Sequence, residues 1–180
     1  MPFTFTPGPL QGLFLIEPRR FPDDRGWFQE GYKRSDFVRA GIPESFVQDN
    51  LSYSSRGTLR GLHFQTGSSA QGKLVSVLAG AVWDVAVDIR PDSPTKGRWF
   101  GVELTAEQPK LFYIPPGFAH GFVALRDGTL FSYKCTAEYD KPSEGGIRWD
   151  DPDLAITWPL EGAQVSDKDK ILPTWKEYWS

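Results

Sequence analysis

The sequence predicts an all-β fold, and three of its features favour that class. Of the 180 residues, 39% are hydrophobic and 24% are charged, so one domain can bury a core. The 18 Gly and 15 Pro are spread along the chain, which suits short strands joined by tight turns. Helical periodicity is scarce, and no long helices alternate with the strands, so a parallel α/β fold is disfavoured. A sandwich, jelly roll or barrel is therefore expected.

About ten short strands are expected, from apolar runs and alternation between turn-forming residues. Gly12–Glu17 is an apolar run followed by turn-forming residues 22–26, and Trp27–Tyr32 then alternates. Asp127-Gly128 is a two-residue hairpin signal that leads into Thr129–Thr136. The remaining expected strands, in order, are Phe46–Tyr53, Thr58–Gln65, Lys73–Leu78, Ala81–Arg90 after a turn at Ala79-Gly80, Arg98–Thr105, Leu111–Ile114 and Gly121–Leu125.

Helices are expected only as short peripheral segments. Ser35–Ala40 can form one or two turns, with Ser35 or Asp36 as the N-cap and Gly41 as the stop. The segment Asp169–Trp179 can hold another, broken at Pro173.

Charge, cysteine content and hydropathy exclude several classes of protein. The 23 acidic and 20 basic residues give a net charge of -3, so no basic surplus indicates nucleic-acid binding. The single cysteine, Cys135, excludes an internal disulfide and a thiolate metal cluster, and we interpret it as a small core residue. The N-terminus lacks a signal-peptide pattern, and the most apolar stretch, Leu74–Val87, is too short to span a bilayer. A soluble, cytoplasmic protein is expected.

The expected strand Ala81–Arg90 has two unlike faces. One face carries Ala81, Trp83, Val85, Val87 and Ile89, and the other carries Val82, Asp84, Ala86 and Asp88. If the apolar face is the one that packs between the sheets, Asp84 and Asp88 could line a polar cavity. The alternative is that both carboxylates are solvated.

Candidate catalytic side chains gather in four places. The densest polar cluster is Arg56–Gln65, where His63 is either structural or catalytic. A Pro-Pro-Gly turn sets His120 at the start of the next strand, either as a polar cap or as a ligand or metal contact at a cavity mouth. Tyr133 shares a face with Phe131 and Cys135, and is either a core residue or a general acid. The run 166–169 is a solvated turn or helix N-cap unless it folds back beside His63.

Taken together, the motifs resemble those of the dTDP-4-dehydrorhamnose 3,5-epimerase family. The resemblance spans about Leu15 to Asp169 and rests on Gln48-Asp49-Asn50, Arg60–Gln65, Gln71-Gly72-Lys73, Asp84–Arg90, Pro116–Phe122, Trp149-Asp150-Asp151-Pro152 and the run Ser166–Asp169. It implies a jelly-roll, cupin-like double-stranded β-helix barrel with short peripheral helices. It also implies a dTDP-sugar substrate, a homodimer, no metal or organic cofactor, and no nucleic-acid or membrane partner.

The resemblance implies roles for individual residues. His63 would be the base, Tyr133 the acid, and Asp169 the partner of His63. The implied substrate-binding residues are Arg25, Glu30, Gln48, Asp49, Asn50, Arg60, Lys73, His120, Glu144 and Lys168. The chain would form a single epimerase domain over 1–180, with a C-terminal extension at about 166–180. We expect the N-terminal region of about 1–32 to be exchanged with a dimer partner.

Epimerisation next to a ketone suits these residue types. A ketone at C4 of the sugar makes the hydrogens at C3 and C5 acidic, because their removal gives an enolate. Neutral histidine is a suitable base near pH 7, and Lys73 is a candidate cation for the enolate oxygen. The planar fork of Arg60 suits a diphosphate. On a flat strand Arg60 and His63 face opposite sides, so a bulge or twist at Gly61, or a diphosphate that reaches round the barrel edge, is needed; the sequence leaves these open.

Three other functions remain open on the sequence. A single-site epimerase, acting at C5 or C3 of another nucleotide 4-keto-6-deoxy sugar, would share the same residues. A metal-dependent cupin would use His63 and His120 as ligands, but Gln65 stands where such proteins usually offer His. A sugar-binding cupin without catalysis would keep Arg60 and Lys73. The implied pathway is the supply of nucleotide-linked L-rhamnose for cell-surface polysaccharide.

Overall fold

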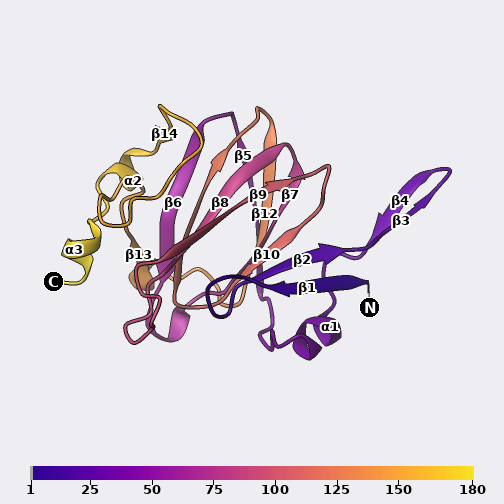
Figure 1. Ribbon diagram of the computed structural model, residues 1–180, viewed down its shortest axis with the longest axis horizontal. Helices are drawn as coiled ribbons and strands as arrows, with labels where there is room; N and C mark the ends of the chain where they lie inside the picture. The colour runs from indigo at the N-terminus through magenta and orange to yellow at the C-terminus, as the bar shows by residue number, and fades with distance from the viewer. Residues whose placement is uncertain (1) are drawn as a thin grey trace.

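The computed structural model describes residues 2–180 and contains two β-sheets that pack face to face (Figure 1). The first sheet has the order β1 (Phe3–Pro7), β2 (Phe14–Pro18), β10 (Leu111–Ile114), β7 (Lys73–Ala79), β12 (Thr129–Cys135) and β5 (Gln48–Ser54). The second has the order β13 (Glu144–Gly146), β6 (Thr58–Gln65), β11 (Phe118–Ala124), β8 (Ala81–Asp88) and β9 (Trp99–Thr105), and β14 (Gln164–Val165) pairs with β6. The predicted all-β jelly roll is confirmed.

The strands expected at Thr58–Gln65 and Leu111–Ile114 have those bounds in the structure, as β6 and β10. The prediction of a hairpin at Asp127-Gly128 is wrong, because the two flanking strands do not pair with each other. Gly128 does take a turn conformation, with φ +67°. β12 pairs with β5 and β7, whereas β11 pairs with β6 and β8. The turn therefore carries the chain from one sheet to the other, which local turn chemistry does not reveal. The short strands β1, β13 and β14 were not expected.

A separate hairpin, β3 (Arg20–Asp23) with β4 (Gly26–Gln29), projects from the body of the molecule (Figure 1). The turn expected at residues 22–26 lies at its tip. Trp27 and Phe28 on the hairpin are 58% and 65% exposed, which is unusual for large apolar side chains next to a packed core.

The helices are short, as expected: α1 (Arg34–Arg39), α2 (Asp167–Lys170) and α3 (Trp175–Tyr178), with single 3-10 turns at Gly67–Ser69 and Lys141–Ser143. The N-cap position of α1 is Lys33 rather than the expected Ser35 or Asp36, and its side chain makes no capping bond. The expected stop at Gly41 is confirmed, with φ +94°. The expected break at Pro173 separates α2 from α3.

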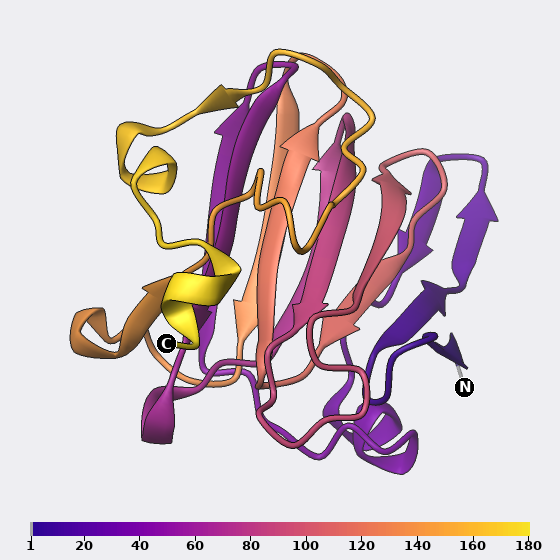
Figure 2. The same cartoon turned by 60° about the vertical axis from the view of Figure 1, so that its left-hand side comes forward.

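Both faces of β8 are buried, which corrects the expectation for this strand. Its face with Val82 and Ala86 packs between the sheets, while Val85 and Val87 pack outward in a second core. Figure 2 shows the C-terminal part of the chain lying over this side of the second sheet. The side chains that pack there are Leu154, Ile156, Trp158, Trp175, Tyr178 and Trp179. Asp84 and Asp88 therefore lie on the inter-sheet face, and both are 0% exposed rather than solvated.

None of the helices in residues 2–180 has the length and apolar character needed to cross a membrane.

Candidate active site

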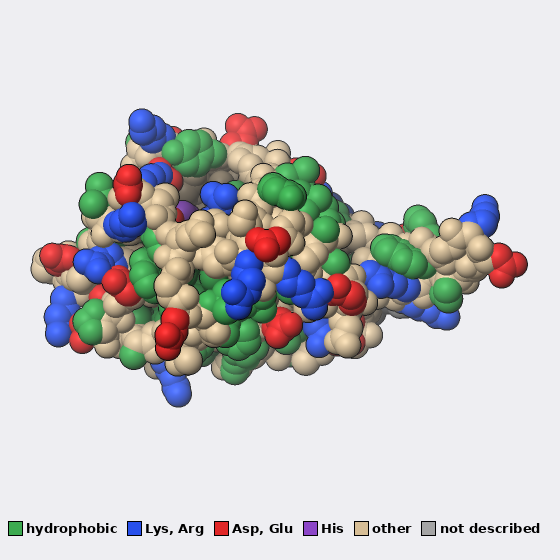
Figure 3. All heavy atoms as spheres, turned by 90° about the horizontal axis from the view of Figure 1, so that it is seen from above, with side chains coloured by type: hydrophobic (Ala, Val, Ile, Leu, Met, Phe, Trp, Pro, Cys, Tyr) green, Lys and Arg blue, Asp and Glu red, His purple; other side chains and the backbone are tan. Residues whose placement is uncertain are grey.

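A cavity of about 660 Å³ opens between the two sheets. In the space-filling view it is a hollow with a histidine side chain visible inside it (Figure 3). Ten residues expected at the site line it: Gln48, Asn50, Arg60, His63, Lys73, His120, Tyr133, Glu144, Lys168 and Asp169. A volume of this size is typical of pockets for small molecules and cofactors.

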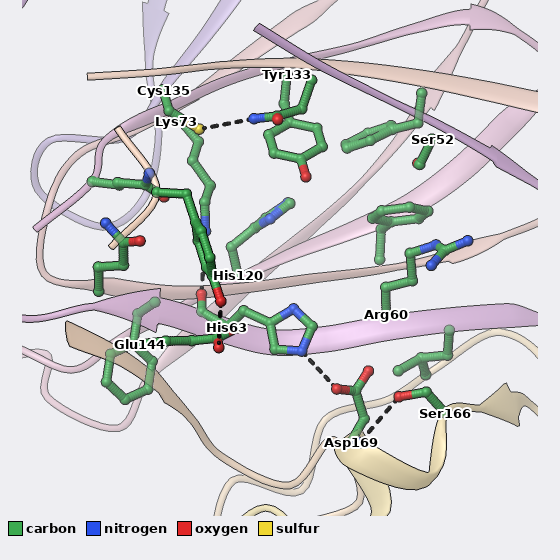
Figure 4. Close-up of a pocket in the computed structure, with 18 of the residues that line it drawn as sticks. Ser52, Arg60, His63, Lys73, His120, Tyr133, Cys135, Glu144, Ser166 and Asp169 are labelled. Atoms are coloured by element: carbon green, nitrogen blue, oxygen red, sulfur yellow. Dashed lines mark hydrogen bonds and ion pairs between the residues drawn. The ribbon is translucent and has the colours of Figure 1, made fainter. Parts of the chain in front are cut away.

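His63 and Asp169 form a pair at the side of this cavity (Figure 4). Nε2 of His63 lies 2.7 Å from Oδ1 of Asp169, and the backbone N–H of Gly61 donates to Oδ2 at 3.3 Å. Burial raises the pKa of Asp169, but the hydrogen bond and charge of His63 hold it below its ordinary value overall. Because an ionised carboxylate only accepts, Nε2 carries the hydrogen and Nδ1 remains free to take a proton.

Tyr133 faces His63 from the opposite sheet. It comes from β12, whereas His63 comes from β6, and its hydroxyl points into the cavity (Figure 4). Burial, with a contribution from Cys135, raises the pKa of Tyr133, so the phenol keeps its proton near neutral pH. Tyr133 shares one face of β12 with Phe131 and Cys135, as expected, and all three side chains line the cavity.

Lys73 and His120 lie deeper, over a buried carboxylate. Nζ of Lys73 donates to the backbone oxygen of His63 at 3.3 Å, and burial lowers the pKa of this lysine while Cys135 and Asp84 oppose that change. Nε2 of His120 lies 2.9 and 3.0 Å from the two oxygens of Asp84. Burial raises the pKa of Asp84, and His120 opposes the rise.

A bulge at Gly61 brings Arg60 and His63 to the same cavity. His63 pairs with His120 and Arg60 with Phe122, so β6 has one residue more than β11 over this interval. Gly61 has φ +141°, and a Cβ atom there would lie 2.5 Å from the Cα of Gly121. Of the alternatives that the sequence leaves open, the structure shows the bulge. The Arg60 guanidinium makes only long contacts, at 3.4 Å to Ser54 and 3.5 Å to Tyr53, so its donors remain available.

An ion pair borders the cavity on the side of β13 and α2. Nζ of Lys168 donates to Oε1 of Glu144 at 2.7 Å, and the hydroxyl of Tyr139 donates to Oε2 at 3.0 Å. The hydrogen bond from Lys168 is the main reason that the pKa of Glu144 is lowered. Gln48 and Asn50 are joined by a 3.0 Å hydrogen bond on β5.

Three of the expected substrate-binding residues do not reach this cavity within the chain. Asp49 points to the other face of β5, where it pairs with Lys134 at 2.7 Å. Arg25 pairs with Asp23 at the tip of the β3–β4 hairpin, and Glu30 follows that hairpin. The run 166–169 does fold back beside His63, since Asp169 pairs with it. Four further lining residues were not assigned a role: Gln71 and Ser166, which belong to motifs named above, and Ser52 and Tyr139, which belong to none. Alternation with Asn50 could have indicated Ser52, whereas no local pattern indicates Tyr139.

Histidine and cysteine, the nitrogen and sulfur ligands of metal sites, are sparse: the sequence has two His and one Cys. No group of three or more His, Cys, Asp or Glu side chains within residues 2–180 is arranged to hold a metal ion.

Comparison with known proteins gives consistent matches along the chain. Residues 7–177 match the family model described as dTDP-4-dehydrorhamnose 3,5-epimerase. The dTDP-4-dehydrorhamnose 3,5-epimerase of Escherichia coli is 50% identical over 170 residues, covering 93% of this chain and 92% of that protein. That of Methanothermobacter thermautotrophicus is 48% identical over 177 residues, covering 97% and 94%.

Solved structures give the same result. The crystal structure of the Elizabethkingia anophelis dTDP-4-dehydrorhamnose 3,5-epimerase has a TM-score of 0.95 and 47% identity, covering 98% of each chain. A Legionella pneumophila epimerase, solved in complex with dTDP-4-keto-L-rhamnose, has a TM-score of 0.92 and 48% identity, covering 96% of this chain and 92% of that one.

Proposed function

Because the chain belongs to the dTDP-4-dehydrorhamnose 3,5-epimerase family, we propose that its cavity binds a dTDP-linked 4-keto-6-deoxy sugar and inverts C3 and C5 by acid–base chemistry. The protein is a carbohydrate epimerase of dTDP-rhamnose biosynthesis. The observation that carries the proposed chemistry is the position of His63, paired with Asp169, across one cavity from the Tyr133 hydroxyl.

In the proposed first step, Nδ1 of His63 removes the hydrogen next to the C4 ketone. The electrons of the C–H bond form the enolate C=C bond, and the carbonyl oxygen takes the negative charge. Asp169 holds the tautomer and stabilises the imidazolium that forms, in the manner of a histidine–aspartate pair in a protease triad. The ammonium of Lys73 stabilises the enolate oxygen, an effect often worth about 10²–10³ in rate.

In the second step, Tyr133 delivers a proton to the opposite face of the same carbon. A new C–H bond forms with inverted configuration and the C4 ketone returns. The imidazolium of His63 then releases its proton to solvent, and the phenolate of Tyr133 takes one up. The raised pKa of Tyr133 supports its role as a donor rather than a base. Two such cycles, one at C3 and one at C5, complete the reaction.

Other cavity residues bind the diphosphate, the sugar and the remainder of the substrate in this proposal. Arg60 holds the diphosphate through guanidinium donors that the chain itself uses only weakly. His120 contacts the sugar, Gln48 and Asn50 line the first-sheet wall, and Glu144 with Lys168 binds at the border.

We also propose that the protein is a homodimer in which a second copy covers the outer face of the first sheet. On that side Leu51 and Tyr53 are 66% and 70% exposed, and the projecting hairpin exposes Trp27. Such a copy brings Arg25 and Glu30 toward the partner's cavity and explains why they do not reach their own. β1, at the edge of its sheet, is free to add to the partner's sheet.

Light scattering tests the dimer proposal. At micromolar concentration it should give twice the 20.3 kDa chain mass, and a monomer would contradict the proposal.

The cytoplasm is the proposed location of the protein. Cys135 is a free, buried thiol, and such thiols are typical of a reducing compartment.

The reaction can be tested by incubation with dTDP-4-keto-6-deoxyglucose in heavy water. Mass spectrometry and NMR of the product should find solvent deuterium at both C3 and C5. Deuterium at one carbon alone would assign a single-site epimerase instead, and no exchange at either carbon would overturn the proposed acid–base chemistry.

A further inference from the structure

Asp169 lies on a helix that is too short to hold it in place. α2 has four residues, and isolated helices of this length are not stable in water. On its N-terminal side it is tied to the second sheet by β14, which pairs with β6 through only two residues, Gln164 and Val165. The position of the Asp169 carboxylate therefore depends on how the chain is anchored after Lys170.

The chain after α2 is anchored beside His63. Both δ carbons of Leu172 would lie 2.7 Å from a Cβ atom built on Gly146, so Leu172 packs directly on that glycine. Gly146 on β13 is the register partner of His63 on β6. The backbone oxygen of Pro173 accepts a hydrogen bond from the N–H of Arg148 at 2.9 Å, which ties the same segment to the end of β13.

The far end of this segment is anchored to the strand that carries His63. The ring of Tyr178 packs edge-on against Phe64, the residue after His63, with centroids 5.2 Å apart. The N–H of Trp175 donates to Oδ2 of the buried Asp151 at 2.7 Å. Reciprocal capping bonds between Thr174 and Glu177 fix the turn that connects these contacts.

We propose that residues Leu172–Trp179, here called the C-terminal strap, position Asp169 against His63. The strap contacts β13 through Leu172 and β6 through Tyr178. It therefore holds α2 against the strand that carries His63 and the strand next to it. Figure 2 shows this segment, in yellow, packed on the outer side of the second sheet, away from the cavity. Leu172 and Tyr178 are positioning residues that act through Asp169, and the proposal rests on the proposed role of Asp169 as partner of the base.

The first test is a set of three variants in the full chain. Tyr178→Ala should lower kcat by roughly 10–100-fold, since small displacements of a catalytic pair are costly, and leave KM for the dTDP-sugar unchanged. Tyr178→Phe keeps the ring on Phe64 and should retain the wild-type kcat. Lys176→Ala is the matched control, because its side chain lies on the same helix, is 80% exposed and pairs only with Asp153 at the surface.

The second test asks whether the strap acts through Asp169. In an Asp169→Asn background, Tyr178→Ala should cause no further loss of kcat, because the carboxylate that it positions is already gone. The strap proposal would be overturned if the double variant lost the product of the two single-variant losses in kcat. A wild-type kcat for Tyr178→Ala alone would overturn it too. If Tyr178→Ala does not fold, Leu172→Ala is measured in the same cycle. A wild-type rate for Asp169→Asn itself would instead overturn the proposed role of Asp169.

Discussion

Two histidine–carboxylate pairs border one cavity, and they differ in burial and in origin. His120 and Asp84 stand on neighbouring strands, β11 and β8, and their side chains are 8% and 0% exposed. The His63 side chain is 35% exposed, and Asp169 reaches it from 106 residues further along the chain. The first pair is built into the inter-sheet core, whereas the second joins a strand to a peripheral helix.

The difference in exposure supports the proposal that His63, rather than His120, transfers the proton. Burial dominates at Asp84 and raises its pKa, while at Asp169 the pairing with His63 prevails and lowers the pKa. His63 therefore has an ionised partner on one nitrogen and the cavity on the other. His120 is held in a fixed orientation under the substrate site, which suits binding.

The largest expected effect separates the two histidines. His63→Ala should lower turnover by at least about 10²–10⁴-fold, the usual contribution of one positioned acid or base. His120→Ala should mainly raise KM, because in the proposed mechanism this side chain binds the sugar and does not transfer the proton. Steady-state kinetics with the dTDP-sugar measures both. If His120→Ala stops solvent exchange and His63→Ala does not, the two assignments must be reversed.

Removal of the buried carboxylate should affect stability more than chemistry. Asp84→Ala leaves His120 buried without its partner, and an unsatisfied buried hydrogen-bonding group costs roughly 1–3 kcal/mol of unfolding free energy. Asp84→Asn keeps an oxygen that can accept from Nε2 and should cost less. Urea unfolding followed by fluorescence measures this difference, and equal stability of the two variants would argue against a structural role for the pair.

A third carboxylate, Asp88, lies on the same face of β8 as Asp84 but differs in the sign of its response to pH. Hydrogen bonds from Arg90, Ser93 and Thr95 outweigh its burial and lower its pKa to about 2. Between pH 3.8 and about 2 the unfolded chain binds more protons at this group than the folded chain, so stability should fall as the pH falls. In thermal unfolding measured across this pH range, Asp88→Asn should reduce the fall of the melting temperature with falling pH. An unchanged pH dependence would exclude Asp88 as its source.

Exhaustive removal of metal ions by a chelator should have no effect on turnover, which makes it the smallest of the expected effects. Nε2 of each histidine already faces a carboxylate, and the proposed mechanism uses no metal. Turnover should be unchanged after dialysis against a strong chelator. Stoichiometric bound zinc, iron or manganese, with activity lost on its removal, would contradict the mechanism.

Much of the fold could be predicted because alternation and turn residues act locally. The strand bounds of β6 and the stop of α1 at Gly41 are examples. The faces of β8 could not be predicted, because the Trp175 and Trp179 side chains that cover its outer face come from the far end of the chain. The hairpin prediction at Asp127-Gly128 was wrong for a similar reason. A turn signal predicts the turn but does not specify which strand the next strand pairs with.

The site was predictable where a motif carried its own chemistry, and not elsewhere. His63 and Lys73 were identified through motifs, and Tyr133 through strand alternation and the family resemblance; the structure brings all three to one cavity. Strand alternation placed Arg60 and His63 on opposite faces, and the sequence could not choose between a bulge or twist at Gly61 and a diphosphate that reaches round the edge; the structure has the bulge. Tyr139 lies outside any motif, so only the folded chain shows that it lines the cavity. Arg25 and Glu30 stay predictions that depend on a second copy.

The most direct test of proton transfer from two faces is Tyr133→Phe in heavy water. This variant keeps the ring that lines the cavity and removes only the proposed acid. His63 should still remove the proton and return a deuteron to the same face, so deuterium should enter the substrate at C5 without inversion. Inversion of C5 at the wild-type rate would make Tyr133 a packing residue and contradict the account.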